Sequence, residues 1–309
     1  MTAVLSDPIF TNEEAARVHF EELRWPNGLY CPHCGEAEKT SPIGGKEVGR
    51  FYCLSCKKKF SATVGTVYER SHIPLHKWLA ATHLMCASKK GISAHQLHRM
   101  LGITYKSAWF MCHRIREAMT DSNPTPMGGN GQIVEVDETF LGQPDQVYEN
   151  NGGWKGKRGY HTKIKVMGLV ERNGRSRLIK VNDLHVGTIA KVLAENVDPN
   201  SRLQTDQAKH YKNHGKKFAK HETVNHSKKE YARGDVTTNS IEGYFGLFKR
   251  GMTGVYQHCG EQHLQKYLNE FDFRYSNRAA LGVDDAMRTE LAVKGAEGKR
   301  LTYRRPQNV

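Results

Sequence analysis

Two pairs of cysteines constrain the fold of this 309-residue chain most strongly. Cys31 and Cys34 form the first pair and Cys53 and Cys56 the second, with two residues inside each pair and 18 between the pairs. This is the spacing of four-cysteine zinc sites, because a tight turn between paired cysteines aims both thiolates at one tetrahedral ion. Two disulfides or unliganded thiols are the alternative, but the odd total of seven cysteines suits reduced thiols better. The sequence therefore predicts a closed, structural Zn²⁺ site in a zinc ribbon over residues 29–70.

The charge of the chain indicates a polyanionic partner. The sequence contains 46 Lys and Arg against 32 Asp and Glu, which gives a formal net charge of +14. Such a charge attracts nucleic acid or an anionic membrane surface. No stretch approaches the roughly 18 to 20 apolar residues of a spanning helix, and the start of the chain lacks the basic and apolar regions of a signal peptide. We therefore expect a cytoplasmic protein that binds DNA and not a membrane.

Changes in periodicity divide the chain into segments. Residues 1–28 contain an amphipathic helix, residues 71–120 contain three helical segments, and residues 121–132 are rich in Pro, Gly, Asn and Ser, as linkers are. Three short strands, a helix, another strand and late helices follow, which predicts a mixed α/β domain over residues 133–285. Residues 286–309 are expected to form a basic C-terminal tail.

The second and third helical segments predict a helix-turn-helix. Ser93 opens the first of these helices, Gly102 forms the turn, and Thr104 can cap the second. One stripe of the second helix is apolar and should be buried: Ala108, Met111, Cys112, Ile115 and Met119. Another face is polar and mostly basic and can enter a major groove: Lys106, Trp109, His113 and Arg116. An ordinary helical hairpin with a basic surface is the alternative, and the neighbouring zinc ribbon favours DNA binding.

Three separated acidic residues are candidates for a second metal site. Asp137 lies near the end of an apolar strand, and Asp206 repeats that arrangement in RLQTDQAKHY. A carboxylate is an unusual residue there unless it faces a site. Glu242 follows on a predicted helix, with Lys249 two turns further along the same face. Mg²⁺ prefers oxygen ligands, and two ions about 3.5 to 4 Å apart need bridging and flanking carboxylates.

Each candidate acid has a structural alternative. Asp137 can instead pair with a basic residue, and a neighbouring glutamate can be the functional group. Strand alternation places Glu135 and Asp137 on one face and Glu138 on the other, which leaves Asp137 as the best candidate. Glu242 can serve in a capping box with Asn239 as the N-cap.

A resemblance to a known family is carried by four stretches, VDETFLG, TDQAKHY, TTNSIEGYFGLFKRGMTGVYQH and LQKYLNEFDFRYSNR. They resemble bacterial insertion-sequence DDE transposases of the zinc-ribbon, ISXO-like group. The resemblance extends from the cysteine pairs to about Asn277. It implies an RNase H-like DDE catalytic domain that cleaves DNA at transposon ends, joins strands to target DNA and uses a divalent metal, Mg²⁺ or Mn²⁺.

The resemblance also implies the roles of individual residues. Asp137 and Asp206 take the first two acidic positions. In this group an asparagine at the place of Asn239 is often counted in the motif, whereas the wider DDE pattern, an acid with Lys or Arg seven residues later, selects Glu242 and Lys249. We favour Glu242, with Asn239 as the alternative.

Basic residues around the core are candidates for DNA contact. Residues 142–162 look like an inserted DNA-binding segment, because aromatic residues there are interleaved with basic ones. The candidates in this segment are Trp154, Lys155, Lys157 and Arg158. Further candidates are Lys57 and Lys58 in the ribbon, and Lys249 and Arg250 on the late helix. Histidines between residues 207 and 233 do not have a recognised zinc spacing, and His226 is a candidate for proton transfer or phosphate contact.

These features together predict a transposase that binds transposon ends, cleaves phosphodiester bonds and catalyses strand transfer by a two-metal mechanism. Its partners are then double-stranded DNA, as transposon ends and as target, in the bacterial cytoplasm. Holding two ends together implies a homodimer or higher oligomer on DNA. The alternatives are a DNA-binding regulator without catalysis and an RNase H-like nuclease without strand transfer. The sequence does not specify the terminal repeat, the target site, or a copy-out or cut-and-paste pathway.

Overall fold

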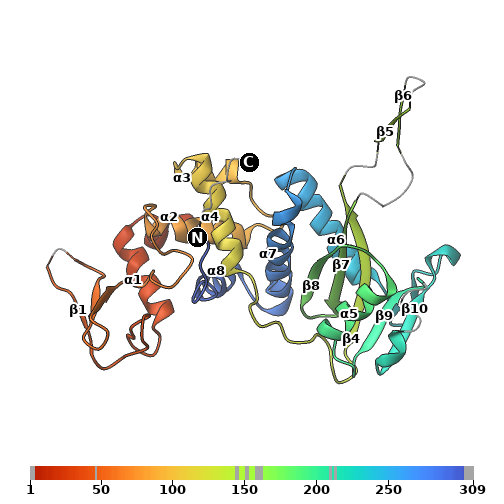
Figure 1. Ribbon diagram of the computed structural model, residues 1–309, viewed down its shortest axis with the longest axis horizontal. Helices are drawn as coiled ribbons and strands as arrows, with labels where there is room; N and C mark the ends of the chain where they lie inside the picture. Colours follow the sequence, from red (N-terminus) through yellow and green to blue (C-terminus); the bar gives the residue numbers. More distant parts are fainter. Residues whose placement is uncertain are drawn as a thin grey trace. The chain divides into compact units, whose positions relative to one another are not determined.

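The chain is described by a computed structural model (Figure 1). The residues it describes are 4–45, 47–142, 146–149, 153–156, 163–208, 211 and 214–302. They form two compact units, one from residues 1–120 together with 278–309 and one from residues 121–277. No helix in the described part of the chain has the length and apolar character needed to cross a membrane.

The first unit begins with helix α1 and a small sheet. The predicted N-terminal helix is α1 (Glu13–Arg24), which Asn12 caps by accepting hydrogen bonds from the backbone N–H groups of the first turn. The sheet is antiparallel, in the order β1-β2-β3, and consists of β1 (Thr40–Pro42), β2 (Phe51–Cys53) and β3 (Lys58–Phe60). The Trp25 ring packs edge-on against Phe51 and Phe60, with ring centroids 5.3 and 6.1 Å away. This aromatic cluster attaches the end of α1 to the ribbon.

The described part of the first unit also contains the α-helices α2 (Leu75–Ala87), α3 (Ala94–Leu101), α4 (Tyr105–Ala118) and α8 (Asp285–Lys294). The three helical segments predicted between residues 71 and 120 are confirmed as α2, α3 and α4. Helix α3 ends at Gly102, whose φ of 60° is left-handed and favours glycine. Thr104 caps α4 by accepting from the Ser107 N–H at 3.2 Å. All five residues of the predicted apolar stripe on α4 are buried.

Helix α8 differs from the predicted basic tail over residues 286–309. Asp284 caps this helix by accepting from the Met287 N–H, and Ala292 and Val293 are buried within the first unit. The Arg288 guanidinium donates to the Cys86 carbonyl at the end of α2 over 3.0 Å. The basic residues of the segment suggested a tail, but its small apolar residues share a helix face that packs against α2.

The second unit is built on a mixed five-stranded sheet in the order β10-β9-β4-β7-β8. Its strands are β4 (Ile133–Leu141), β7 (Ile164–Glu171), β8 (Ser176–Val181), β9 (Arg202–Asp206) and β10 (Lys220–Val224). Strands β4, β7 and β8 pair antiparallel, whereas β9 and β10 run parallel to β4. The predicted order of three strands, a helix and a strand is confirmed by β4, β7, β8, α5 (Val186–Asn196) and β9.

Helices cover both faces of this sheet. Residues of α5 pack with Val134, Val136 and Leu203 on one face. The other face packs against α6 (Asn239–Gly251) and α7 (Leu264–Ser276) through Val166, Val170 and Leu178. The short hairpin of β11 (Ala232–Arg233) and β12 (Val236–Thr237) precedes α6. The sheet is thus the middle layer of three.

The segment 121–132 differs from the predicted linker at Met127. This side chain is fully buried in the core beneath α5, and its N–H donates to the Asn196 carbonyl at 2.8 Å. The segment is rich in turn-forming residues, but the buried side chain of Met127 and hydrogen bonds to Glu171 and Ser201 attach it to the sheet unit.

The predicted basic insertion over residues 142–162 contains two short antiparallel strands, β5 (Gln146–Glu149) and β6 (Gly153–Gly156). Lys157 and Arg158 lie outside the described residues, as do the side chains of Trp154 and Lys155. Their predicted contact with DNA stays a prediction.

Candidate active site and metal centre

The register of two parallel strands brings the first two candidate acids together. Strands β4 and β9 pair from Ile133↔Arg202 to Glu135↔Gln204. Asp137 and Asp206 continue this register two residues further along both strands. Because side chains alternate along a strand, Asp137 and Asp206 project from the same face as Glu135 and Gln204.

This face is the one covered by α6. Asp137 pairs with Gly168 on β7, and a Cβ added to Gly168 would lie 2.6 Å from Ile241 and 2.7 Å from Phe245 of α6. Glu138 belongs to the opposite face, where the buried Tyr211 donates a hydrogen bond to it. The predicted alternation, with Asp137 on one face and Glu138 on the other, is confirmed.

The electrostatics of Asp137 show that the three candidate acids interact. Burial, together with the negative charges of Glu138, Asp206 and Glu242, raises the pKa of Asp137 to about 7. The N–H of Glu138 donates to Asp137 Oδ1 at 2.8 Å, which opposes this shift. A half-buried carboxylate next to other carboxylates, as here, is stabilised in its ionised form by a cation.

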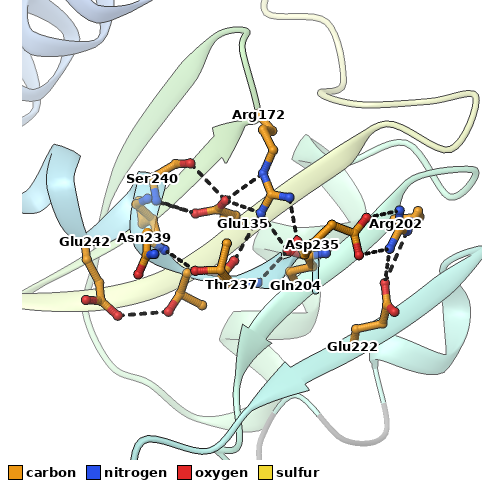
Figure 2. A network of polar contacts seen from close by, with 12 residues as sticks. Glu135, Arg172, Arg202, Gln204, Glu222, Asp235, Thr237, Asn239, Ser240 and Glu242 are labelled. Carbon is orange, nitrogen blue, oxygen red and sulfur yellow. Dashed lines mark hydrogen bonds and ion pairs between the residues drawn. The ribbon is translucent and has the colours of Figure 1, made fainter. Parts of the chain in front are cut away.

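Glu242 lies in the first turns of α6, where its side chain is 45% exposed. Its carboxylate accepts a hydrogen bond from Thr238 Oγ1 at 2.9 Å (Figure 2) and lies 3.4 Å from Nε2 of His226. The alternative role of Asn239 as an N-cap is wrong, because Thr238 precedes the helix and Asn239 is its first residue. The side chains of Asn239 and Glu242 are both exposed at the start of α6.

The donor set of the three acids fits a hard divalent cation, because Mg²⁺ and Mn²⁺ prefer carboxylate oxygens and retain several waters. The carboxylate oxygens of Asp137, Asp206 and Glu242 do not all lie within 4.8 Å of one another. Among the described residues, only the four cysteines form a group of three or more side chains whose candidate ligand atoms all lie within 4.8 Å of one another.

The four cysteines form a compact site at the ends of the ribbon strands. The Sγ atoms of Cys31 and Cys56 are 3.7 Å apart, and those of Cys34 and Cys53 are 3.6 Å apart. A tetrahedral ion with Zn–S bonds of about 2.3 Å places its sulfurs about 3.8 Å from one another. The cysteines thus fit a structural Zn²⁺ ion, as their spacing predicts.

The residues predicted to meet DNA lie in different surroundings. Lys57, Lys58 and Lys106 are exposed in the first unit, and Lys249 and Arg250 are exposed on α6. His113 and Arg116 are only 3% and 2% exposed, and the ring of Trp109 packs edge-on against His113 with centroids 4.2 Å apart. The predicted polar face of α4 is therefore open at its N-terminal end and buried towards its C-terminal end.

The sequence of this chain matches two known domain families. The ISXO2-like transposase domain matches residues 128–276, and the transposase zinc-ribbon domain matches residues 11–59. The chain belongs to this group of insertion-sequence transposases. All three candidate acids of this transposase-family chain fall within the first match and all four cysteines within the second.

A relative from Halobacterium salinarum is described as an uncharacterized protein in transposable element ISH50. It is 28% identical to this transposase-family chain over 277 residues, which cover 86% of the chain and 91% of the relative. The similarity thus extends over both units.

Sequence reasoning did not assign roles to Arg172 and Gln204, which lie next to the acids. Arg172 follows β7 directly, and Gln204 is buried on β9. The sequence does contain one indication of Gln204: Glu135 and Gln204 each come two residues before a candidate acid, on the same face of its strand. A polar side chain buried on that face needs a hydrogen-bond partner.

Gly168 allows α6 to approach the sheet beside Asp137. The change Gly168→Ala should push Ile241 and Phe245 outwards, lower the free energy of unfolding by about 1 to 3 kcal/mol through overpacking, and reduce activity. Thermal unfolding and DNA cleavage of this variant can be compared with Gly243→Ala, whose added Cβ meets no atom within 4 Å. Equal effects of the two changes would contradict the close approach.

Proposed function

We propose that this protein is an active DDE transposase that binds transposon-end DNA, cleaves it and joins the freed 3′-OH to target DNA. The observation that carries the proposal is the register of β4 and β9, whose last pair is Glu135↔Gln204. Two residues further along each strand, Asp137 and Asp206 project from the face covered by α6. Glu242 lies close enough to raise the pKa of Asp137 through its negative charge. Family membership supports transposition as the process in which these acids act.

The topology of the second unit supports an RNase H-like catalytic domain. Three antiparallel strands come first, a helix follows on one face, and the next two strands add in parallel beyond the first strand. This order places the carboxyl end of β9 beside β4, at the edge where ligands of open α/β sheets gather.

In the proposed reaction, Asp137, Asp206 and Glu242 hold two divalent ions, with Asn239 as the alternative third ligand. Bound Mg²⁺ or Mn²⁺ supplies activation of water or of a 3′-OH and stabilisation of the leaving oxygen. The chain itself positions the carboxylates and the DNA backbone. Lys249 and Arg250, exposed on α6, are placed to contact phosphates.

The first unit is the proposed DNA-holding part. The ribbon presents Lys57 and Lys58, and the α3–α4 pair is proposed to act as a helix-turn-helix through the open end of α4. On this assignment Lys106 and Trp109 contact DNA, whereas the buried Arg116 and His113 support the helix. Binding should weaken steeply with salt, because phosphate contacts release counterions.

The test is a supercoiled donor plasmid that carries the terminal repeats of the element, incubated with the full-length protein. We expect cleavage at the repeat ends with Mg²⁺ or Mn²⁺ and none with EDTA. Cleavage that persists in EDTA would refute the metal-dependent mechanism. Binding of the repeats without cleavage under all metal conditions would instead support a DNA-binding regulator.

A further inference from the structure

A second pair of polar side chains, which we call the second tier, lies on the same face of the sheet as the candidate catalytic acids, two residues earlier on each strand. Glu135 and Gln204 are partners in the β4–β9 register, and each comes two residues before an acid, Asp137 or Asp206. Both side chains are fully buried. Buried polar groups are costly unless they are hydrogen-bonded, so their partners indicate what this tier does.

Glu135 binds the first turn of α6. Its carboxylate accepts hydrogen bonds from the N–H groups of Ser240 and Ile241, at 2.8 and 3.1 Å, and from Ser240 Oγ at 2.9 Å. A carboxylate is favoured there, because helix N-terminal N–H groups are unsatisfied and carry partial positive charge. These bonds lie between Asn239 and Glu242, the two candidates for the third ligand.

Arg172 joins both members of the tier to the segment before α6 (Figure 2). Its guanidinium donates to Glu135 Oε1 at 2.7 Å and to Gln204 Oε1 at 2.9 Å. It also donates to the main-chain carbonyls of Asp235 and Thr237, at 2.6 and 3.4 Å. One guanidinium therefore contacts both acid-bearing strands and the main chain that leads into the helix of the third ligand.

Gln204 completes the connection from the other strand. Its Oε1 accepts from the Thr237 N–H at 3.1 Å in addition to Arg172. At the edge of the sheet, Arg202 donates to Asp235 and to Glu222, each at 2.7 Å, which holds the β11–β12 hairpin against β9 and β10 (Figure 2). The segment entering α6 is thus held at several points.

We propose that Glu135, Arg172 and Gln204 form a positioning clamp that fixes the third metal ligand of α6 relative to Asp137 and Asp206. The clamp rests on the proposed metal-dependent function. Arg172 is a positioning residue and not a catalytic one, because its bonds go to Glu135, Gln204 and main-chain carbonyls. The planar guanidinium group suits this role, because one side chain can donate hydrogen bonds to several acceptors in fixed directions.

The test measures the Mn²⁺ concentration that gives half-maximal DNA cleavage, using the full-length protein. For Arg172→Ala we expect this concentration to rise and the maximal rate to fall, each by about 10-fold to 100-fold, as when partners of metal ligands are removed. Arg172→Lys should recover part of the loss, because lysine keeps the charge but cannot serve all the acceptors. Gln204→Leu keeps the size of the side chain and should shift the metal requirement in the same direction.

Arg175→Ala is the matched control. Arg175 lies three residues after Arg172, pairs with Glu171 at 2.9 Å and donates to Thr125 and Pro126. Its replacement by alanine therefore removes a comparable set of contacts, none of which involves α6. We expect Arg175→Ala to lower thermal stability while the metal requirement stays unchanged. If Arg172→Ala and Gln204→Leu are folded and match Arg175→Ala in metal requirement, the clamp is refuted. If Arg172→Ala does not fold, Gln204→Leu and Arg172→Lys decide by the same readout.

Different results would refute the clamp and the proposed function. Full activity of Asp137→Asn and Asp206→Asn would refute the proposed function, whatever the clamp variants do. Inactive acid variants combined with an unchanged metal requirement in the clamp variants would refute the clamp alone.

Discussion

Replacing Asp137 or Asp206 by asparagine is expected to lower metal-dependent DNA cleavage by a factor of about 10³ or more, equivalent to about 4 kcal/mol of activation free energy. Asparagine keeps the size of the side chain but loses the negative charge that binds the metal. Cleavage of donor plasmid under single-turnover conditions measures the effect. Glu195→Gln is a suitable control, because Glu195 is an exposed acid of α5 with a weak 3.9 Å ion pair to Lys191.

The Asp137→Asn variant should remain folded, which separates a catalytic loss from unfolding. The pKa of Asp137 is raised to about 7 by burial and by neighbouring carboxylates. The stability that this group contributes is therefore present at low pH and is lost as the pH rises from about 4 through about 7. At pH 8 without metal, Asp137→Asn should have a Tm equal to or above that of the unmodified protein. A clearly lower Tm would show that the carboxylate has a structural role.

The third ligand can be assigned by comparing Glu242→Gln with Asn239→Ala. We expect Glu242→Gln to lose activity as strongly as the aspartate variants and Asn239→Ala to lose much less, because Glu242 supplies a carboxylate close to Asp137. The opposite order would assign the position to Asn239.

Loss of zinc is expected to unfold the ribbon and to abolish specific DNA binding. Structural zinc sites contribute apparent binding free energies of about 10 to 16 kcal/mol in zinc-finger peptides, more than a small three-stranded sheet can replace. The change Cys53→Ser removes a buried ligand. The measurements are the zinc content of the purified protein, expected to fall from about one ion per chain to none, and the affinity for terminal-repeat DNA.

The control for the zinc experiment is Cys259→Ser in the second unit, outside the group of four cysteines. This variant should keep its zinc and its DNA affinity. If Cys53→Ser retains a full equivalent of zinc, the four-cysteine site is refuted. If it loses zinc but binds DNA normally, the ribbon has no role in holding DNA.

Local sequence patterns predicted the features that depend on residues close together in the chain. The cysteine spacing predicted the ribbon, and the apolar period of α4 predicted its buried stripe, which extends from Ala108 to Met119. Strand alternation correctly separated Glu138 from Asp137, because the period of two holds on any β-strand.

Features that depend on distant contacts could not be read from the sequence. The burial of Met127 and the packing of α8 depend on residues far along the chain. The same holds for Arg172, whose partners Glu135, Gln204 and Thr237 come from three separate segments. Its basic character alone suggested another surface charge in a chain with 46 Lys and Arg.

The most direct test of the central claim is strand joining. A donor duplex that ends in the terminal repeat with a free 3′-OH is incubated with the protein, Mn²⁺ and a target plasmid, and covalently joined donor–target DNA is measured. The account predicts joined product with the unmodified protein and none with Asp137→Asn, Asp206→Asn or Glu242→Gln. Cleavage without any joined product would identify a nuclease, and joining by all three variants would contradict the proposed active site.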